Sequence, residues 1–310
     1  MCKWKVSVFV QQQHSVSSFD KGGESWVILS EIEQSIKRKI EAVGTPLKDW
    51  DIQINYGIKT GFNDAFIIST EKRDEILSNC KNEEERKKTA ELIRPILRGR
   101  DIKRYSYDWA NLWLVYIPWH FPLHLDNSIQ GCSEKAEKEF QKQYPAIYNH
   151  LLGYKKQLSA RNKAETGIRY EWYALQRWGA NYWEDFSKQQ IVWIELSDDP
   201  KFALAEKIMS VNTVFFMTGE HILHLLGLLN SRLITWYFRH CIGTTSGVGT
   251  NRWLKYTIEQ IPMAPVSSKL KELSFLITKS YNEEKNQEID LLVCRLYNLN
   301  EDEITYIISQ

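Results

Sequence analysis

The chain has almost no net charge and no long hydrophobic run. It carries 40 Lys and Arg against 39 Asp and Glu, a formal net charge of +1, so no global field attracts it to a polyanion. Any nucleic-acid site must therefore come from a local cluster of cations. No apolar stretch approaches the length of a membrane span, and the N-terminus lacks the pattern of a signal peptide. We expect a cytoplasmic protein with no membrane partner.

The sequence also lacks paired cysteines and a metal-binding motif. The five cysteines are scattered and form no CxxC pair: Cys2, Cys80, Cys132, Cys241 and Cys294. This distribution favours a reducing compartment and argues against a structural zinc. His120 with His124, and His221 with His224, have ligand-like spacing but no HExxH motif or cysteine partner. We interpret these histidines as structural and predict no metal site.

No recognisable catalytic constellation is present. A nuclease needs an acidic pair followed by an E-x-K element at a strand end. The triplets at 85–87 and 283–285 match only the letters, because both lie in charged stretches of helical composition. The Gly- and Thr-rich loop at 243–251 lacks the GK[ST] ending of a P-loop, which leaves a phosphate-contacting loop as its alternative. We predict no catalytic residue in this chain.

The stretch from Asp51 to Ser69 is the most informative local pattern. Apolar residues alternate with polar ones from 51 to 58, which predicts a strand with one buried face. A polar turn at Lys59, Thr60 and Gly61 then precedes a second apolar run, so we predict two strands joined as a hairpin. Lys59, Thr60 and Asn63 are residue types that bond phosphates and base edges, although an ordinary hairpin turn remains the alternative.

The remaining periodicities predict further helices and short strands. Ser30 with Glu33, and Asn300 with Glu303, make capping boxes for two helices. We expect further helices at 83–97, in two pieces at 133–161, at 221–240 and at 269–299. Short strands are expected at 112–119, 191–196, 202–205 and 213–217. Residues 1–24 are expected to be a tail or linker.

Basic residues are concentrated in two segments, although the whole chain has almost no excess of them. Five of the eleven residues at 94–104 are cations, and Gly99 indicates a loop that lets the arginines point together; a solvated helix end is the alternative. Residues 161–177 interleave cations with Tyr and Trp, a mixture that suits a nucleic-acid surface. The DNA-contacting candidates are Lys59, Thr60, Asn63, Arg98, Arg100, Lys103, Arg104, Arg161, Arg169, Tyr173, Gln176 and Arg177.

Several of these stretches resemble, in the same order, the C-terminal specificity region of restriction-modification proteins that fuse a methyltransferase to a target-recognition domain. The relevant group includes the TaqI-like specificity domain and the type IIG enzymes. The resembling residues are Ser25 to Ile54, YGIKTGFNDAFII at 56–68, ELIRPILRGRDIKRY at 91–105, YEWYALQR at 170–177, LLGLLNSRL at 225–233 and EIDLLVCRLYNLNEDEI at 288–304.

The resemblance implies an α+β fold with a mixed sheet and a helical C-terminal part. It also implies a double-stranded DNA target-recognition domain, which we expect at 25–262, followed by a helical region at 263–310. The Gly-rich cofactor turn and the NPPY-like tetrapeptide of the fused methyltransferases do not occur here. S-adenosylmethionine and magnesium are therefore expected only on missing methyltransferase and nuclease domains or subunits, with no cofactor in this chain. The alternatives are a scaffold that docks such a subunit through the C-terminal helices and a complete enzyme with an unrecognised site.

Overall fold

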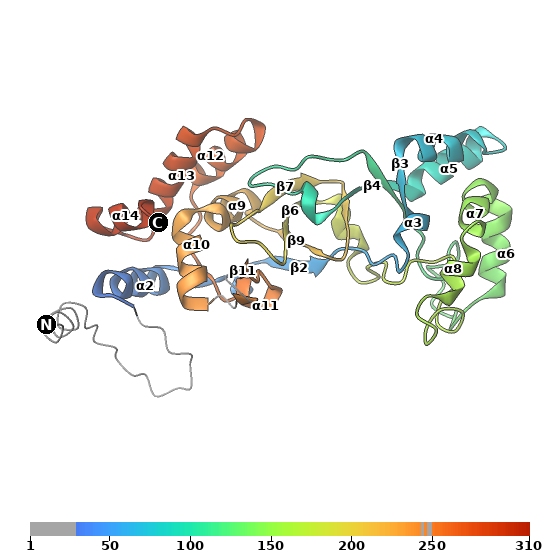
Figure 1. Ribbon diagram of the computed structural model, residues 1–310, viewed down its shortest axis with the longest axis horizontal. Helices are drawn as coiled ribbons and strands as arrows, with labels where there is room; N and C mark the ends of the chain where they lie inside the picture. The colour runs from blue at the N-terminus through green and yellow to red at the C-terminus, as the bar shows by residue number, and fades with distance from the viewer. Residues whose placement is uncertain (1–28, 243–244, 247–249) are drawn as a thin grey trace, which may run out of the picture. The chain divides into compact units, whose positions relative to one another are not determined.

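The computed structural model describes residues 29–242, 245–246 and 250–310 (Figure 1). These residues divide into two units. The central unit contains residues 52–195 and 201–222, and the terminal unit contains residues 29–51, 196–200 and 223–310. This division does not follow the boundary expected at residue 262, because the helix before the first long strand groups with the C-terminal helices. The tail expected at 1–24 lies outside the described residues.

Two four-stranded sheets organise the central unit. The first has the order β2-β9-β6-β7 with antiparallel pairs, formed by β2 (Ile52–Tyr56), β6 (Gln189–Ile194), β7 (Ala203–Glu206) and β9 (Val214–Gly219). The second has the order β3-β5-β4-β8, formed by β3 (Ile67–Ser69), β4 (Ile93–Leu97), β5 (Leu112–Val115) and β8 (Met209–Ser210), of which β4 and β8 run parallel. The strands predicted between 191 and 217 are confirmed as β6, β7 and β9.

The predicted hairpin after β2 is wrong. β2 pairs with β9, placing Ile54 opposite Met217, whereas β3 pairs with β5 in the other sheet. Between them the chain runs against a distant backbone segment, and a Cβ on Gly57 would lie 2.2 Å from the carbonyl oxygen of Val211. Glycine is required at this position because no side chain fits in that approach. The almost wholly buried β9 offers β2 a partner that the local sequence does not reveal.

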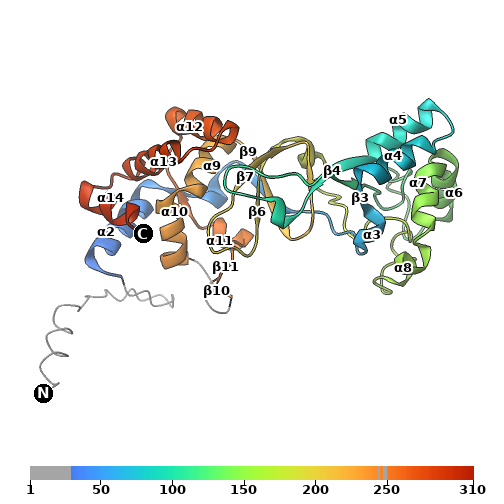
Figure 2. The same ribbon diagram turned by 45° about the horizontal axis from the view of Figure 1, so that its top comes forward.

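The central unit also contains helices, some of which pack on its second sheet. They are α3 (Asn63–Phe66), α4 (Thr70–Ser78), α5 (Glu83–Leu92), α6 (Glu134–Gln143), α7 (Pro145–Leu152) and α8 (Lys155–Ala160). Figures 1 and 2 show α4, α5, α6 and α7 grouped at one end of this unit. The helix predicted at 83–97 is too long: it ends at Leu92, and the apolar residues around Pro95 form β4, since proline lacks the N–H that a helix interior needs.

The terminal unit is mainly helical. It contains α2 (Glu31–Val43), most of α9 (Ile222–Asn230), α10 (Arg232–Tyr237), α11 (Lys255–Ile258), α12 (Ser268–Lys279), α13 (Glu283–Leu296) and α14 (Glu301–Ile308), with a π-helix at Phe238–Ile242. Two small antiparallel pairs accompany them: β1 (Thr45–Pro46) with β12 (Pro262–Met263), and β10 (Thr245–Ser246) with β11 (Thr250–Asn251).

Local capping explains where several of these helices begin. The predicted capping boxes are confirmed: the main-chain N–H of Ser30 donates to Glu33 at 2.6 Å, and that of Asn300 donates to Glu303 at 2.8 Å. The single helix expected at 221–240 is instead two, because the Ser231 hydroxyl accepts from the main-chain N–H of Ile234 and starts α10. The α+β fold class is confirmed, with helices and mixed sheets as predicted.

No helix in the described residues is both long and apolar enough to span a bilayer. The core of the central unit instead takes in much of the aromatic content, including Tyr170, Trp172 and Tyr173. These three residues belong to the segment at 161–177, which is therefore half interior and half surface. The short 3-10 helices at Leu47–Asp49, Gly99–Asp101 and Trp183–Ser187 connect the larger elements.

Candidate nucleic-acid interface

Arg161 lies inside the central unit, directly after α8. The residue is 9% exposed, and its guanidinium donates to the main-chain carbonyls of Leu158, Thr60, Trp172 and Ala174, at 3.2 Å to Leu158 and 2.9 Å to Trp172. Burial lowers the pKa of Arg161 to about 10, so the group stays charged at neutral pH. The sequence placed Arg161 among the DNA contacts, but in this structure it ties the start of a loop to two other segments.

The loop that follows, residues 162–170, is held by its own main chain. The N–H of Arg169 donates to Glu165 O at 2.7 Å, and the N–H of Gly167 donates to Tyr170 O at 2.8 Å. The carbonyl of Ile168 accepts from the N–H of Cys132 at 2.8 Å, which fixes the loop to a neighbouring segment. Two runs of three residues are exposed, and the partly exposed Glu165 and the buried Thr166 separate them; the exposed residues are Asn162, Lys163, Ala164, Gly167, Ile168 and Arg169. The loop therefore presents a defined row of side chains to solvent.

Glu165 joins the two exposed arginines of this surface. Arg177 Nη1 and Nη2 lie 3.1 and 3.3 Å from the two carboxylate oxygens, and Arg169 Nη1 lies 3.2 Å from one of them. The hydrogen bonds from Arg177, together with the charge of Arg169, lower the pKa of the Glu165 carboxyl, so it is ionised at neutral pH. The side chain of Arg169 remains 60% exposed and that of Arg177 53% exposed. One carboxylate thus orients two cations that still face solvent.

Lys59 lies beside Arg177 through a main-chain pairing. The N–H of Lys59 donates to Arg177 O at 3.1 Å, and the N–H of Arg177 donates back at 2.9 Å. This bridge brings the turn after β2 to the end of the 161–177 segment, a proximity that no local sequence pattern predicts. We define the interface cluster as Lys59, Lys163, Arg169 and Arg177 with the carboxylate of Glu165. The contacts above join three of its cations, and Lys163 is included because it is exposed on the same loop. The cluster thus has four cations and one acid, in a chain whose net charge is +1.

The other candidates near this cluster are more buried. Tyr173 is fully buried and donates its hydroxyl to Phe121 O at 2.9 Å, so it supports the segment from below. Gln176 is 9% exposed, and Thr60 is 4% exposed with its hydroxyl donating to Asn63 Oδ1 at 2.6 Å. Asn63 itself is exposed at the start of α3. Of this group, Asn63 therefore offers the most accessible polar side chain.

The second basic segment is largely paired. Arg98 makes a two-pronged contact with the buried Asp101, at 3.1 Å from Nε and 2.7 Å from Nη2. Burial acts to raise the pKa of Asp101, but the hydrogen bonds from Arg98 outweigh it and the pKa is lowered. Lys103 forms an ion pair with Asp108, and Arg104 lies 5.5 Å from the ring centre of Tyr105. Arg100 is exposed in the short 3-10 helix.

Three further residues of this candidate surface were not predicted from the sequence. Trp119 lies beneath Arg169, with the guanidinium carbon 5.7 Å from its ring centre, and stacks on Tyr170 at 4.8 Å. Glu165 was not among the candidates, although its spacing of four residues from Arg169 is a usable signal for an ion pair. Ile168 was overlooked because it is apolar. Fold alone brings Trp119 to the loop, and no local pattern predicts it.

Other polar groups in the described residues do not form a competing site. No cluster of three or more His, Cys, Asp or Glu able to hold a metal ion occurs within those residues. The E-x-K triplets lie on α5 and α13. His120 pairs with the buried Glu171, its Nδ1 3.0 Å from the carboxylate, and His224 contacts Ala264 O at 3.0 Å. Most of the loop at 243–251 lies outside the described residues.

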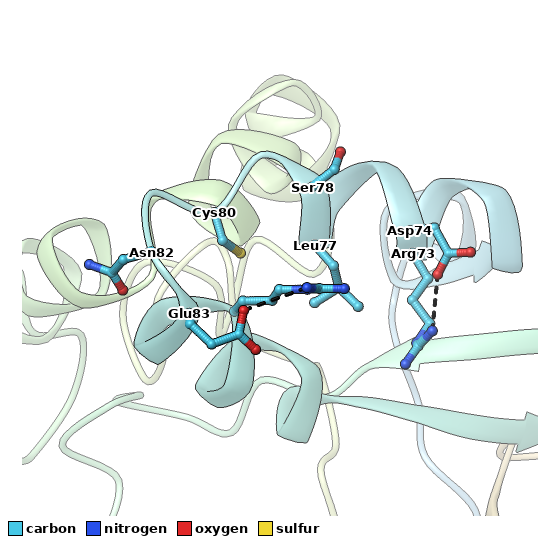
Figure 3. A pocket seen from close by; sticks show the side chains of 8 residues that line it. Arg73, Asp74, Leu77, Ser78, Cys80, Asn82 and Glu83 are labelled. Carbon is cyan, nitrogen blue, oxygen red and sulfur yellow. Dashed lines mark hydrogen bonds and ion pairs between the residues drawn. The ribbon is translucent and has the colours of Figure 1, made fainter.

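A surface pocket is lined by residues of α4, of α5 and of the segment between them (Figure 3). Two arginines line it, but each has an adjacent acid: Arg73 lies 3.0 Å from Asp74, and Arg86 lies 3.5 Å from Glu83. Arg73 also lies over the ring of Trp113, at 4.3 Å from its centre. Because the acids offset the arginine charges, this pocket lacks the excess of one sign that an anionic ligand needs.

Comparisons with known proteins give the class of the molecule. The model of the TaqI-like C-terminal specificity domain matches residues 94–263. The chain is similar to the type IIL restriction-modification enzyme MmeI solved in complex with DNA, at 11% identity and a TM-score of 0.50, over 94% of this chain and 38% of that chain. It is also similar to the type IIG restriction endonuclease BpuSI, at 14% identity and a TM-score of 0.48, over 86% and 32% of the two chains. No curated protein matches the sequence.

Fold and family match together define a target-recognition module of the restriction-modification class. The MmeI likeness, at 11% identity, shows the fold alone. The family match covers more than half of the chain, and the chain belongs to the TaqI-like C-terminal specificity domain family. The resemblance found in the sequence is thereby confirmed. The chain spans 38% of the length of MmeI and 32% of that of BpuSI.

Proposed function

We propose that this chain recognises a specific double-stranded DNA sequence through the interface cluster and the 162–170 loop. The observation that carries the proposal is the meeting of Lys59, Arg169 and Arg177 on one exposed surface of a specificity domain. The three residues come from two segments more than 100 positions apart, and all were candidates from the sequence. A local excess of cations supplies the attraction to phosphate that the nearly neutral chain lacks overall.

Different residue types in the cluster suit different parts of the DNA. Lys59 and Lys163 are flexible point charges that suit phosphate oxygens. Arg169 and Arg177 are planar forks that suit the two acceptors of guanine, and Glu165 holds them in orientation before DNA arrives. Asn63 lies nearby and suits an adenine edge. The remaining candidates of this region are buried and pack beneath the surface: Thr60, Arg161, Tyr173 and Gln176.

The basic segment at 94–104 has a secondary part in this proposal. Arg100 is exposed and Lys103 is held by an acid at the surface, so both suit phosphate contacts. Arg98 is held by the buried Asp101 and orients the main chain of the short 3-10 helix. Its release would leave a buried carboxylate without a partner, which disfavours transfer of Arg98 to DNA.

Selection of bound duplexes from a random pool at moderate salt tests the proposal. A recovered consensus is the expected result, because a specificity domain discriminates its site from random DNA by a factor of about 10³ or more. The matched control is a chain with Arg169→Gln and Arg177→Gln, which should recover no consensus. If the wild-type chain enriches no sequence, or if the control enriches the same one, the proposal fails.

We propose in addition that the missing activities reside elsewhere. S-adenosylmethionine and magnesium would be held by a methyltransferase and a nuclease domain or subunit, and the whole assembly would act in the cytoplasm. The chain spans only 38% of the MmeI chain, which leaves room for such parts. Titration calorimetry with S-adenosylmethionine should give no binding heat with this chain alone, and a measurable heat would contradict the assignment.

A second candidate function is docking of the catalytic part by the C-terminal helices. The observation that favours it is the exposure of two adjacent apolar side chains on α12, Phe275 at 44% and Leu276 at 40%. Co-purification of this chain with a methyltransferase subunit, lost on Phe275→Ser with Leu276→Ser, is the expected result. Retention of the complex by that variant would contradict docking at α12.

A further inference from the structure

Ile168 stands out on the loop that carries the arginines. Its side chain is 61% exposed although it is apolar, and Arg169 follows it directly. Single exposed hydrophobic residues are common on protein surfaces and need no explanation by themselves. This one differs in its surroundings, because it lies on the surface proposed to meet DNA and on a loop whose main chain is fixed.

The backbone around Ile168 is held on both sides. Its N–H donates to Glu165 O at 3.1 Å, and its carbonyl accepts from Cys132 N at 2.8 Å. The preceding Gly167 adopts a φ of +76°, a conformation that glycine reaches without strain, and an added Cβ there would meet nothing within 4 Å. The loop thus turns at Gly167, and the side chain of the next residue is largely exposed.

The side chain of isoleucine is also restricted in itself. Branching at Cβ leaves it few χ1 rotamers, so it loses little conformational freedom on contact. A stiff apolar group on a fixed loop, next to an arginine fork, is complementary to a base edge that combines hydrogen-bond acceptors with an apolar group. In the major groove that apolar group is the C5-methyl of thymine.

We propose that Ile168 is a specificity-determining residue that packs on the C5-methyl group of a thymine in the recognised site. This inference rests on the proposed function and names one base contact within it. Arg169 lies next to it in sequence and suits a guanine or a phosphate adjacent to that thymine, while Glu165 keeps the arginine from folding over the isoleucine. The contact requires no movement of the loop main chain.

Replacement of thymine by deoxyuridine provides the test, because it removes the methyl group and leaves every hydrogen-bonding group of the base pair unchanged. The probe is the duplex recovered by selection from the random pool, made with thymine or with deoxyuridine at each thymine in turn. For the wild-type chain, one position should weaken binding about fourfold, the effect expected for loss of one buried methyl group. The Ile168→Ala chain should bind both duplexes equally.

Two control variants separate this contact from a general loss of structure. Ile168→Val keeps a branched apolar side chain and should keep most of the discrimination. Leu152→Ala removes a side chain that is 42% exposed on α7 and should discriminate as the wild type does. All three variants alter exposed positions, so their thermal unfolding should match that of the wild type.

The outcomes distinguish this inference from the function on which it rests. If the wild-type chain binds its selected duplex but no deoxyuridine weakens it, or if the consensus holds no A·T pair, the assignment of Ile168 fails while DNA recognition stands. If Ile168→Ala shows the same deoxyuridine effect as the wild type, another residue contacts the methyl group and the inference is overturned. If the wild type selects no sequence at all, both proposals fall together.

Discussion

Replacing Arg161 by methionine separates a structural arginine from a DNA contact. The guanidinium donates four hydrogen bonds to main-chain carbonyls in a residue that is 9% exposed. At about 1.5 kcal/mol for each bond to a charged group, their loss costs about 6 kcal/mol. Removal of a buried charge recovers about 3 kcal/mol of desolvation. We therefore expect Arg161→Met to lower the free energy of unfolding by about 3 kcal/mol.

Urea-induced unfolding, followed by tryptophan fluorescence and circular dichroism, measures this difference. Arg161→Lys should lose less, because an ammonium group retains the charge and part of the hydrogen bonding but does not span all four carbonyls. Arg169→Met is the matched control: its side chain is 60% exposed, so stability should change by less than about 0.5 kcal/mol while DNA affinity falls. If Arg161→Met matches the wild type in stability and loses DNA binding alone, Arg161 is a DNA contact and the reasoning is refuted.

Three further predictions concern charge and pH. In this proposal Lys59 and Lys163 of the interface cluster neutralise about two phosphates, so affinity should fall about 12-fold from 50 to 200 mM salt and only about 3.5-fold for Lys59→Gln, measured by fluorescence anisotropy. An unchanged slope would remove Lys59 from the phosphate contacts. Burial lowers the pKa of His150, so protons bind the unfolded chain more readily, and stability should fall as the pH drops from about 6.5 to 5. Urea midpoints of His150→Asn should show a shallower fall, and an equal fall would contradict this cause. The Glu303 carboxylate accepts from the main-chain N–H of Asn300 at the start of α14 and lies 2.6 Å from Lys39 Nζ. Glu303→Ala should therefore lower the free energy of unfolding by about 2 kcal/mol in the same assay. No change in that free energy would mean that these contacts contribute nothing to stability.

Signals that act within one turn of helix were readable from the sequence. The capping boxes at Ser30 and Asn300 form as predicted, because donor and acceptor are three residues apart and need no help from the rest of the fold. The partners of β2 and β3 were not readable in the same way. β2 is completed by β9, about 160 residues later, and the choice depends on burial of apolar faces that a local window does not contain.

The candidate site was located better by region than by residue. Residues 161–177 were expected to carry the interface, and Arg169 and Arg177 are indeed exposed there. Arg161 and Tyr173 have the same composition signal but lie inside. Arg161 is buried because its guanidinium hydrogen-bonds the carbonyls of Thr60, Trp172 and Ala174, which come together only in the folded chain. An arginine in a basic, aromatic segment therefore cannot be assigned to the surface from its type alone.

Two variants of equal net charge test the central claim most directly, namely that the interface cluster is the DNA-contacting surface. One replaces Lys59, Arg169 and Arg177 by glutamine, and the other replaces Lys269, Lys271 and Lys279 on α12. Binding of each to the selected duplex is compared with that of the wild type at one salt concentration. We predict that the first loses at least about 100-fold in affinity, since three cations and their base contacts are removed, while the second stays within about threefold. Equal losses for the two variants would contradict the claim.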